Sequence, residues 1–65
     1  MNPQKPTAPD LAAEAAACLR MAGIEDRRFD GHTYSRLYLD RWVIDGDVLE
    51  WDAAIAALLA PVKVS

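Results

Sequence analysis

Two Asp-Gly dipeptides, Asp30-Gly31 and Asp45-Gly46, stand 15 residues apart in this chain of 65 residues. Between residues that favour strands, Asp-Gly is the strongest short signal for a β-hairpin, because both central residues of a type I′ turn need positive φ. The residues around these two pairs that favour strands are Thr33, Tyr34, Tyr38, Trp42, Val43 and Ile44. The sequence therefore predicts a short antiparallel β-meander in the middle of the chain.

The second hairpin has a predicted register. If it closes on Asp45-Gly46, the opposed pairs are Ile44 with Asp47, Val43 with Val48, Trp42 with Leu49, and Arg41 with Glu50. The last pair carries opposite charges, which is the favourable cross-strand arrangement.

The faces of this meander depend on one irregularity. Leu37 and Leu39 point to one side in a regular strand, whereas the apolar residues after them point to the other. A bulge near Asp40-Arg41 would place six apolar residues on a single inward face: Leu37, Leu39, Trp42, Ile44, Leu49 and Trp51. The opposite, solvent-facing side would then carry Tyr34, Arg36, Tyr38, Val43 and Val48.

Helical patterns flank the meander. Thr7 is a predicted N-cap, the apolar stripe Leu11, Ala15, Cys18, Leu19 and Ala22 follows at helical spacing, and Gly23 ends the helix. A second helix, capped by Asp52, carries Ile55, Leu58 and Leu59 and ends at Pro61.

The predicted fold class is α+β, with an N-terminal helix, a short antiparallel β-meander and a C-terminal helix. We expect residues 1–6 to form a disordered tail and residues 7–65 to form a single small globular domain. An alternative stays open: Asp47 and Glu50 also fit a capping box, in which case a helix begins at Val48 and the protein is an all-α three-helix bundle.

Composition limits the class of function. The net charge of −3 argues against a nucleic-acid binder that uses its whole surface, because such proteins usually present a basic face. A single cysteine allows no internal disulfide, and no apolar leader or span is present, so we expect a cytoplasmic protein that does not bind membranes.

The residues that could carry chemistry are few. His32 is the only histidine, and Asp30 could orient it as a general base, but we interpret it as a solvated turn residue. We interpret Cys18 as a buried structural cysteine. The acidic stretch from Asp45 to Asp52 fails the EF-hand pattern, which wants a glycine where Glu50 stands. We therefore predict no cofactor, no metal site and no enzyme.

Arginines alternate with aromatic residues in the middle of the chain. Five arginines lie between positions 20 and 41, interleaved with Phe29, Tyr34, Tyr38 and Trp42. This composition is typical of interface hot spots and of stacking platforms for single-stranded nucleic acid. The predicted protein-binding residues are Arg27, Arg28, Tyr34, Arg36 and Tyr38. An open sheet edge would also allow addition to a partner's sheet.

The functional hypothesis is a small non-catalytic inhibitor or adaptor that sterically occupies a larger protein partner. In size and composition the chain is like the small proteins that phages and mobile elements make to inhibit or retarget a larger machine. Two alternatives are a nucleic-acid-binding regulator that uses the same arginines and tyrosines, and a homodimeric structural module.

Overall fold

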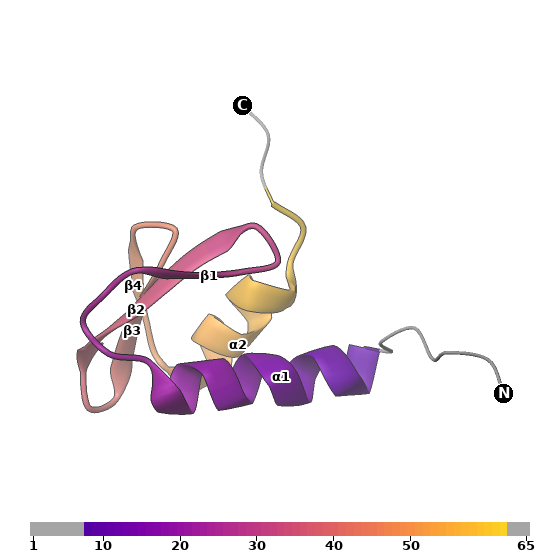
Figure 1. Ribbon diagram of the computed structural model, residues 1–65, viewed down its shortest axis with the longest axis horizontal. Helices are drawn as coiled ribbons and strands as arrows, with labels where there is room; N and C mark the ends of the chain where they lie inside the picture. Colours follow the sequence, from indigo (N-terminus) through magenta and orange to yellow (C-terminus); the bar gives the residue numbers. More distant parts are fainter. Residues whose placement is uncertain (1–7, 63–65) are drawn as a thin grey trace, which may run out of the picture.

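The computed structural model describes residues 8–62, so the predicted tail at 1–6 and the predicted cap Thr7 lie outside the described residues. The elements are, in order, α1 (Ala8–Met21), β1 (Arg27–Phe29), β2 (His32–Tyr38), β3 (Arg41–Ile44), β4 (Asp47–Leu49) and α2 (Trp51–Leu59). The strands form one antiparallel sheet in the order β1-β2-β3-β4 (Figure 1). The α+β prediction is confirmed, and the three-helix alternative is wrong.

Both Asp-Gly pairs form the predicted turns. Asp30 and Gly31 have φ values of 49° and 87°, and Asp45 and Gly46 have φ values of 51° and 89°. Aspartate tolerates this left-handed conformation better than most residues, and glycine adopts it freely. The two turns therefore set β1 against β2 and β3 against β4.

The β3–β4 register agrees with the sequence in three pairs: Trp42 with Leu49, Val43 with Val48, and Ile44 with Asp47. The fourth predicted pair, Arg41 with Glu50, does not form, because β4 ends at Leu49 and Glu50 is already the N-cap of α2. The predicted cap Asp52 instead lies in the first turn of α2, where its charge suits the helix dipole.

The bulge lies earlier than predicted. Arg36 pairs with Trp42 and Tyr38 pairs with Arg41, so the register shifts at Leu37 rather than at Asp40-Arg41. This difference reverses the predicted faces of β2. Tyr34 and Arg36 turn toward the helices, whereas Leu37 and Leu39 are exposed. The predicted inward position of these two leucines is therefore wrong.

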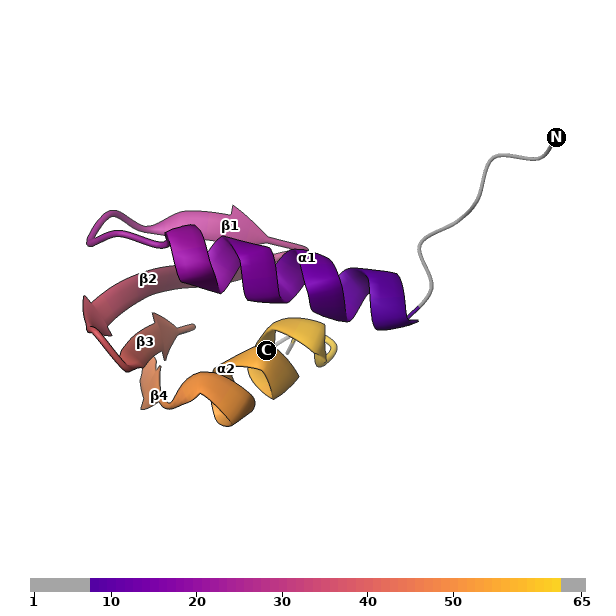
Figure 2. The same cartoon turned by 90° about the horizontal axis from the view of Figure 1, so that it is seen from below.

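The two helices lie on the same, concave side of the curved sheet (Figure 2). Between the layers, Leu19, Ile44 and Leu58 are fully buried. Trp42 and Trp51 meet edge to face, with ring centroids 5.3 Å apart. Val43 and Val48 lie on the other side of the sheet, which no described element covers. Within residues 8–62, neither helix has the length and hydropathy that a bilayer crossing requires.

Candidate functional site

The five predicted contact residues do not form one solvated face. Tyr34 is only 6% exposed and belongs to the core, whereas Tyr38 is 66% exposed at the end of β2. Arg27 and Arg28 are exposed on the edge strand β1. Arg36 is half-buried and has a structural role. The predicted surface is therefore divided into separate parts.

Arg36 closes the C-terminal end of α1. Its Nε donates to the carbonyl of Ala22 at 3.0 Å, and one terminal nitrogen donates to the carbonyls of Leu19 and Arg20, both at 2.9 Å. The other terminal nitrogen donates to the carbonyl of Leu39 at 2.9 Å. The last carbonyls of a helix have no hydrogen-bond donor within the helix and carry partial negative charge. A guanidinium supplies both the missing donors and a positive charge. Arg36 therefore stabilises the joint between α1 and the β2–β3 hairpin.

Trp42 reinforces this joint. The Arg36 guanidinium lies over its ring, 5.0 Å from the centroid, and its indole nitrogen donates to the carbonyl of Leu19 at 2.8 Å. Cation–π contacts gain strength when they are shielded from water. The pairing of Arg36 with Trp42 in the β2–β3 register explains why both side chains reach the same helix end.

Five exposed apolar residues belong to the segments that meet at this joint, and we refer to them as the apolar end: Met21, Ile24, Leu37, Tyr38 and Leu39. Ile24 and Leu39 are each 88% exposed. The backbone N–H of Arg36 donates to the carbonyl of Gly23 at 2.7 Å, which holds the α1–β1 loop against β2. Figure 1 shows that loop and the β2–β3 turn at the same end of the molecule. Large contiguous apolar patches on soluble proteins mark interaction sites, whereas single exposed apolar residues are common.

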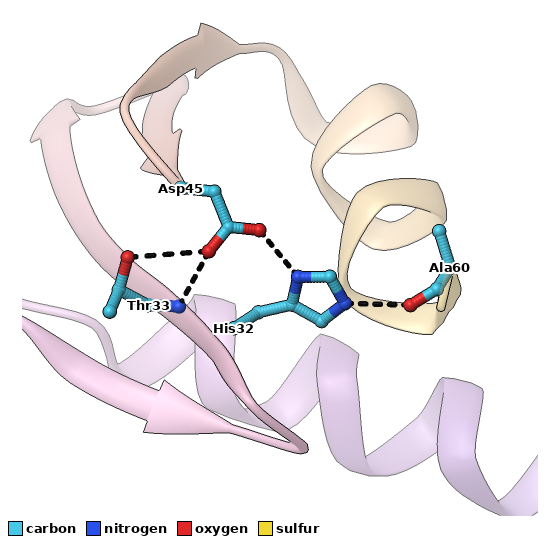
Figure 3. A network of polar contacts seen from close by, with 4 residues as sticks. All are labelled: His32, Thr33, Asp45 and Ala60. Atoms are coloured by element: carbon cyan, nitrogen blue, oxygen red, sulfur yellow. Dashed lines mark hydrogen bonds and ion pairs between the residues drawn. The ribbon is translucent and has the colours of Figure 1, made fainter. Parts of the chain in front are cut away.

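His32 is not the solvated turn residue predicted from the sequence. It is 4% exposed, its Nδ1 lies 2.5 Å from Asp45 Oδ2, and its Nε2 lies 2.6 Å from the carbonyl oxygen of Ala60 (Figure 3). Both neighbours are acceptors, so both ring nitrogens donate only when the imidazole is charged. The hydrogen bond to Asp45, followed by that to Ala60, raises the pKa of His32. Asp45, not Asp30, is the hydrogen-bonded carboxylate.

Asp45 is itself held by β2. Its Oδ1 accepts from the backbone N–H of Thr33 at 3.0 Å. The hydrogen bond from His32, then that from Thr33, lowers the pKa of Asp45. A charged imidazole with both N–H groups engaged has no lone pair to accept a proton, so this arrangement is a poor general base. It joins the β3–β4 turn, β2 and the end of α2.

Two hollows flank these features. One, of about 490 Å³, lies beside His32 and is lined by Asp45, Asp47 and the end of α2. Its lining includes no serine, threonine, cysteine or lysine, and the described residues form no cluster that could hold a metal ion. The other, of about 300 Å³, is a groove between α1 and β1, lined by Ala17, Cys18, Met21, Arg27 and Tyr34.

Cys18 is half-buried at this groove rather than fully buried as predicted. Burial and, second, a side-chain hydrogen bond with Cys18 raise the pKa of the Tyr34 hydroxyl. Tyr34 is therefore a protonated part of the groove floor at neutral pH.

Comparisons with known protein families, with characterised proteins and with solved structures found no match for this chain.

Proposed function

We propose that this chain is a small non-catalytic inhibitor or adaptor, which acts by occupying the surface of a larger protein. The observation that carries the proposal is the apolar end, where five exposed apolar residues lie on segments that hydrogen bonds of Arg36 hold together. Tyr38 is the residue that the apolar end shares with the surface predicted from the sequence. Interface centres are enriched in aromatic side chains and methionine, both of which occur here.

The apolar end suits binding because it is held rigidly. Arg36 hydrogen-bonds to carbonyls of α1 and to Leu39, so the two segments that carry the apolar side chains keep a fixed relation. A surface that is already ordered loses less conformational entropy on association.

The nucleic-acid alternative has less support. A stacking platform needs exposed rings and free cations, but Tyr34 lies in the core and Arg36 is bonded to the backbone of α1. Arg27 and Arg28 remain exposed on β1. Binding through them to phosphate would weaken steeply with salt, whereas binding through the apolar end would change little.

Affinity capture from the native host tests the proposal. The wild-type protein, an Ile24→Ser/Leu39→Ser variant and a Val48→Ser control would be used as bait at equal concentration. Val48 is also exposed but lies on the far side of the sheet. We expect a partner that the wild type and Val48→Ser retain and the double variant loses. Equal retention by all three proteins would overturn the proposal.

A further inference from the structure

We infer that the free edge of β1 and the groove beside it take an extended acidic segment of the partner protein, which adds to the sheet as a further strand. This inference rests on the proposed function, because Met21 belongs both to the apolar end and to the groove. One partner could therefore contact the two surfaces together. The following contacts of β1 support this mode of binding.

The backbone of β1 is available at Arg28. β1 is an edge strand, and Arg28 is paired with Thr33 of β2. The backbone N–H and carbonyl of Thr33 both point toward β3. The N–H donates to Asp45 Oδ1 at 3.0 Å, and the carbonyl accepts from the Asp45 N–H at 3.0 Å. In an antiparallel ladder, the residue opposite such a position also directs its N–H and C=O away from the shared ladder. Arg28 therefore presents one donor and one acceptor to an incoming strand.

The charges of β1 select an acidic segment. Arg27 is opposite Tyr34 and lines the groove, whereas Arg28 is opposite Thr33 on the uncovered face of the sheet. Within residues 8–62, neither arginine forms an ion pair. An added strand would thus place an acidic side chain on the uncovered face within reach of the Arg28 guanidinium, and opposite charges across a strand pair are favourable.

The surroundings limit where acidic side chains of the segment lie. Asp26 and Asp30 stand at the two ends of β1. They disfavour acidic side chains beyond the central part of an added strand, because like charges that face one another repel. The other edge strand, β4, begins with Asp47 and is followed by Glu50, so it repels the same segment. The charge distribution therefore favours β1 over β4.

The groove adds a side-chain site. An extended strand directs alternate side chains to opposite faces, so every second residue of the segment would point toward the groove. Ala17, Cys18 and Met21 present a mainly apolar wall on the side of α1. The geometry thus points to a segment in which apolar residues alternate with acidic ones.

Fluorescence polarisation with short labelled peptides tests the inference. The probes are a peptide of alternating glutamate and valine, its lysine and valine counterpart, and the glutamate peptide with N-methylated central amides. We expect the wild type to bind the glutamate peptide more tightly than either of the others. Equal binding of the glutamate and lysine peptides, no binding of the glutamate peptide, or full binding of the N-methylated peptide would overturn the inference.

Charge-reversal variants provide the matched comparison. Arg28→Glu should weaken binding of the glutamate peptide about three- to tenfold and improve binding of the lysine peptide. Arg41→Glu changes the net charge equally at an exposed site that lines neither hollow, and it should have no such effect. Equal effects of the two substitutions would contradict the inference. If Arg28→Glu does not fold, Arg28→Ala tests the same loss of affinity.

The apolar-end variant separates this inference from the proposed function. Ile24→Ser/Leu39→Ser does not alter the groove, so it should bind the glutamate peptide like the wild type. Partner capture that depends on the apolar end, without any peptide binding, overturns the inference alone. Light scattering of the free protein adds a check, because self-association that Arg28→Glu abolishes would show a second copy, not a partner, at this edge.

Discussion

His32 and Asp45 form an ion pair that joins the start of β2 to the β3–β4 turn, with Nδ1 and Oδ2 2.5 Å apart. The histidine side chain is 5% exposed and the carboxylate 46%, so the pair lies at the boundary between core and solvent. The other ring nitrogen of His32, Nε2, hydrogen-bonds to the carbonyl of Ala60 and so connects the ring to the end of α2. The charged ring of His32 thus holds three segments together: the start of β2, the β3–β4 turn and the end of α2.

The stability of the protein should depend on pH through this pair. The pKa of His32 is raised above its ordinary 6.5, so its stabilisation is complete below about pH 6.5 and is lost as the pH rises through the folded-state pKa. The pKa of Asp45 is lowered from 3.8, so its contribution is present above about pH 3.8 and is lost at lower pH. We expect the stability advantage of the wild type over His32→Gln to be largest between these limits.

Urea denaturation of both proteins across the pH range measures this advantage. Asp45→Asn serves as the control, because it removes the carboxylate and should reduce the dependence attributed to His32. A difference between wild type and His32→Gln that stays constant from pH 5 to pH 9 would show that the ring is not charged in the folded state.

Replacement of Arg36 should destabilise the fold. Arg36→Met removes the donors for three carbonyls at the end of α1 and for Leu39 while keeping the apolar part of the side chain. Hydrogen bonds to charged groups contribute about 1.5–3 kcal/mol each, but water can reach part of this site, so we expect a total loss of about 2–4 kcal/mol. Denaturant titration measures it, with Arg27→Met as the exposed control. A loss equal to that of the control would contradict the structural role of Arg36.

The β3–β4 turn gives a third prediction. Gly46 has a φ of 89° and nothing within 4 Å of an added Cβ, so the cost of a side chain there comes from the backbone alone. Gly46→Val should destabilise the protein by at least about 1 kcal/mol, because a β-branched residue resists this conformation. Gly23→Val is the matched control, since Gly23 has the same open space without a left-handed φ. Similar melting temperatures for the two variants would argue against the turn.

Polar substitutions at the apolar end should leave the fold intact. Ile24 and Leu39 are already exposed, so their side chains bury little area on folding. Ile24→Ser/Leu39→Ser should change the free energy of unfolding by less than about 1 kcal/mol, whereas Leu58→Ser, at a fully buried position, should unfold the protein or nearly so. Thermal melts followed by circular dichroism make the comparison. A large loss in the double variant would mean that the apolar end supports the core.

Local backbone chemistry explains what could be predicted from the sequence. A type I′ turn depends on two adjacent residues, so Asp30-Gly31 and Asp45-Gly46 fix both hairpin turns. The register next to the second turn follows by counting outward, which is why the Val43–Val48 pair was predictable. The prediction failed beside the β2–β3 turn, which has no Asp-Gly pair, because the bulge at Leu37 reverses the faces of β2. Period alone cannot locate such a bulge, because several positions preserve the apolar alternation.

The polar contacts of Arg36 and His32 were harder to predict, because their hydrogen-bond partners lie far away in the sequence. The sequence predicts an outward Arg36 because charged side chains usually meet water, but the last carbonyls of α1 provide it with partners inside. The sequence predicts a solvated His32 because the residue follows the Asp30-Gly31 turn, whereas its acceptors in the structure are Asp45 and Ala60. The register that pairs Tyr34 with Ile44 would have brought Asp45 beside Thr33, and this was the available signal.

Site-specific photo-crosslinking shows whether the apolar end is the contact surface. A benzophenone amino acid would be placed at position 38 in one protein and at position 48 in another, and both would be irradiated in the native host. We predict a discrete crosslinked product with a larger protein from position 38, its yield reduced by Ile24→Ser, and none from position 48. Equal products from both positions, or none from position 38 in the folded protein, would contradict the assignment of the apolar end as the contact surface.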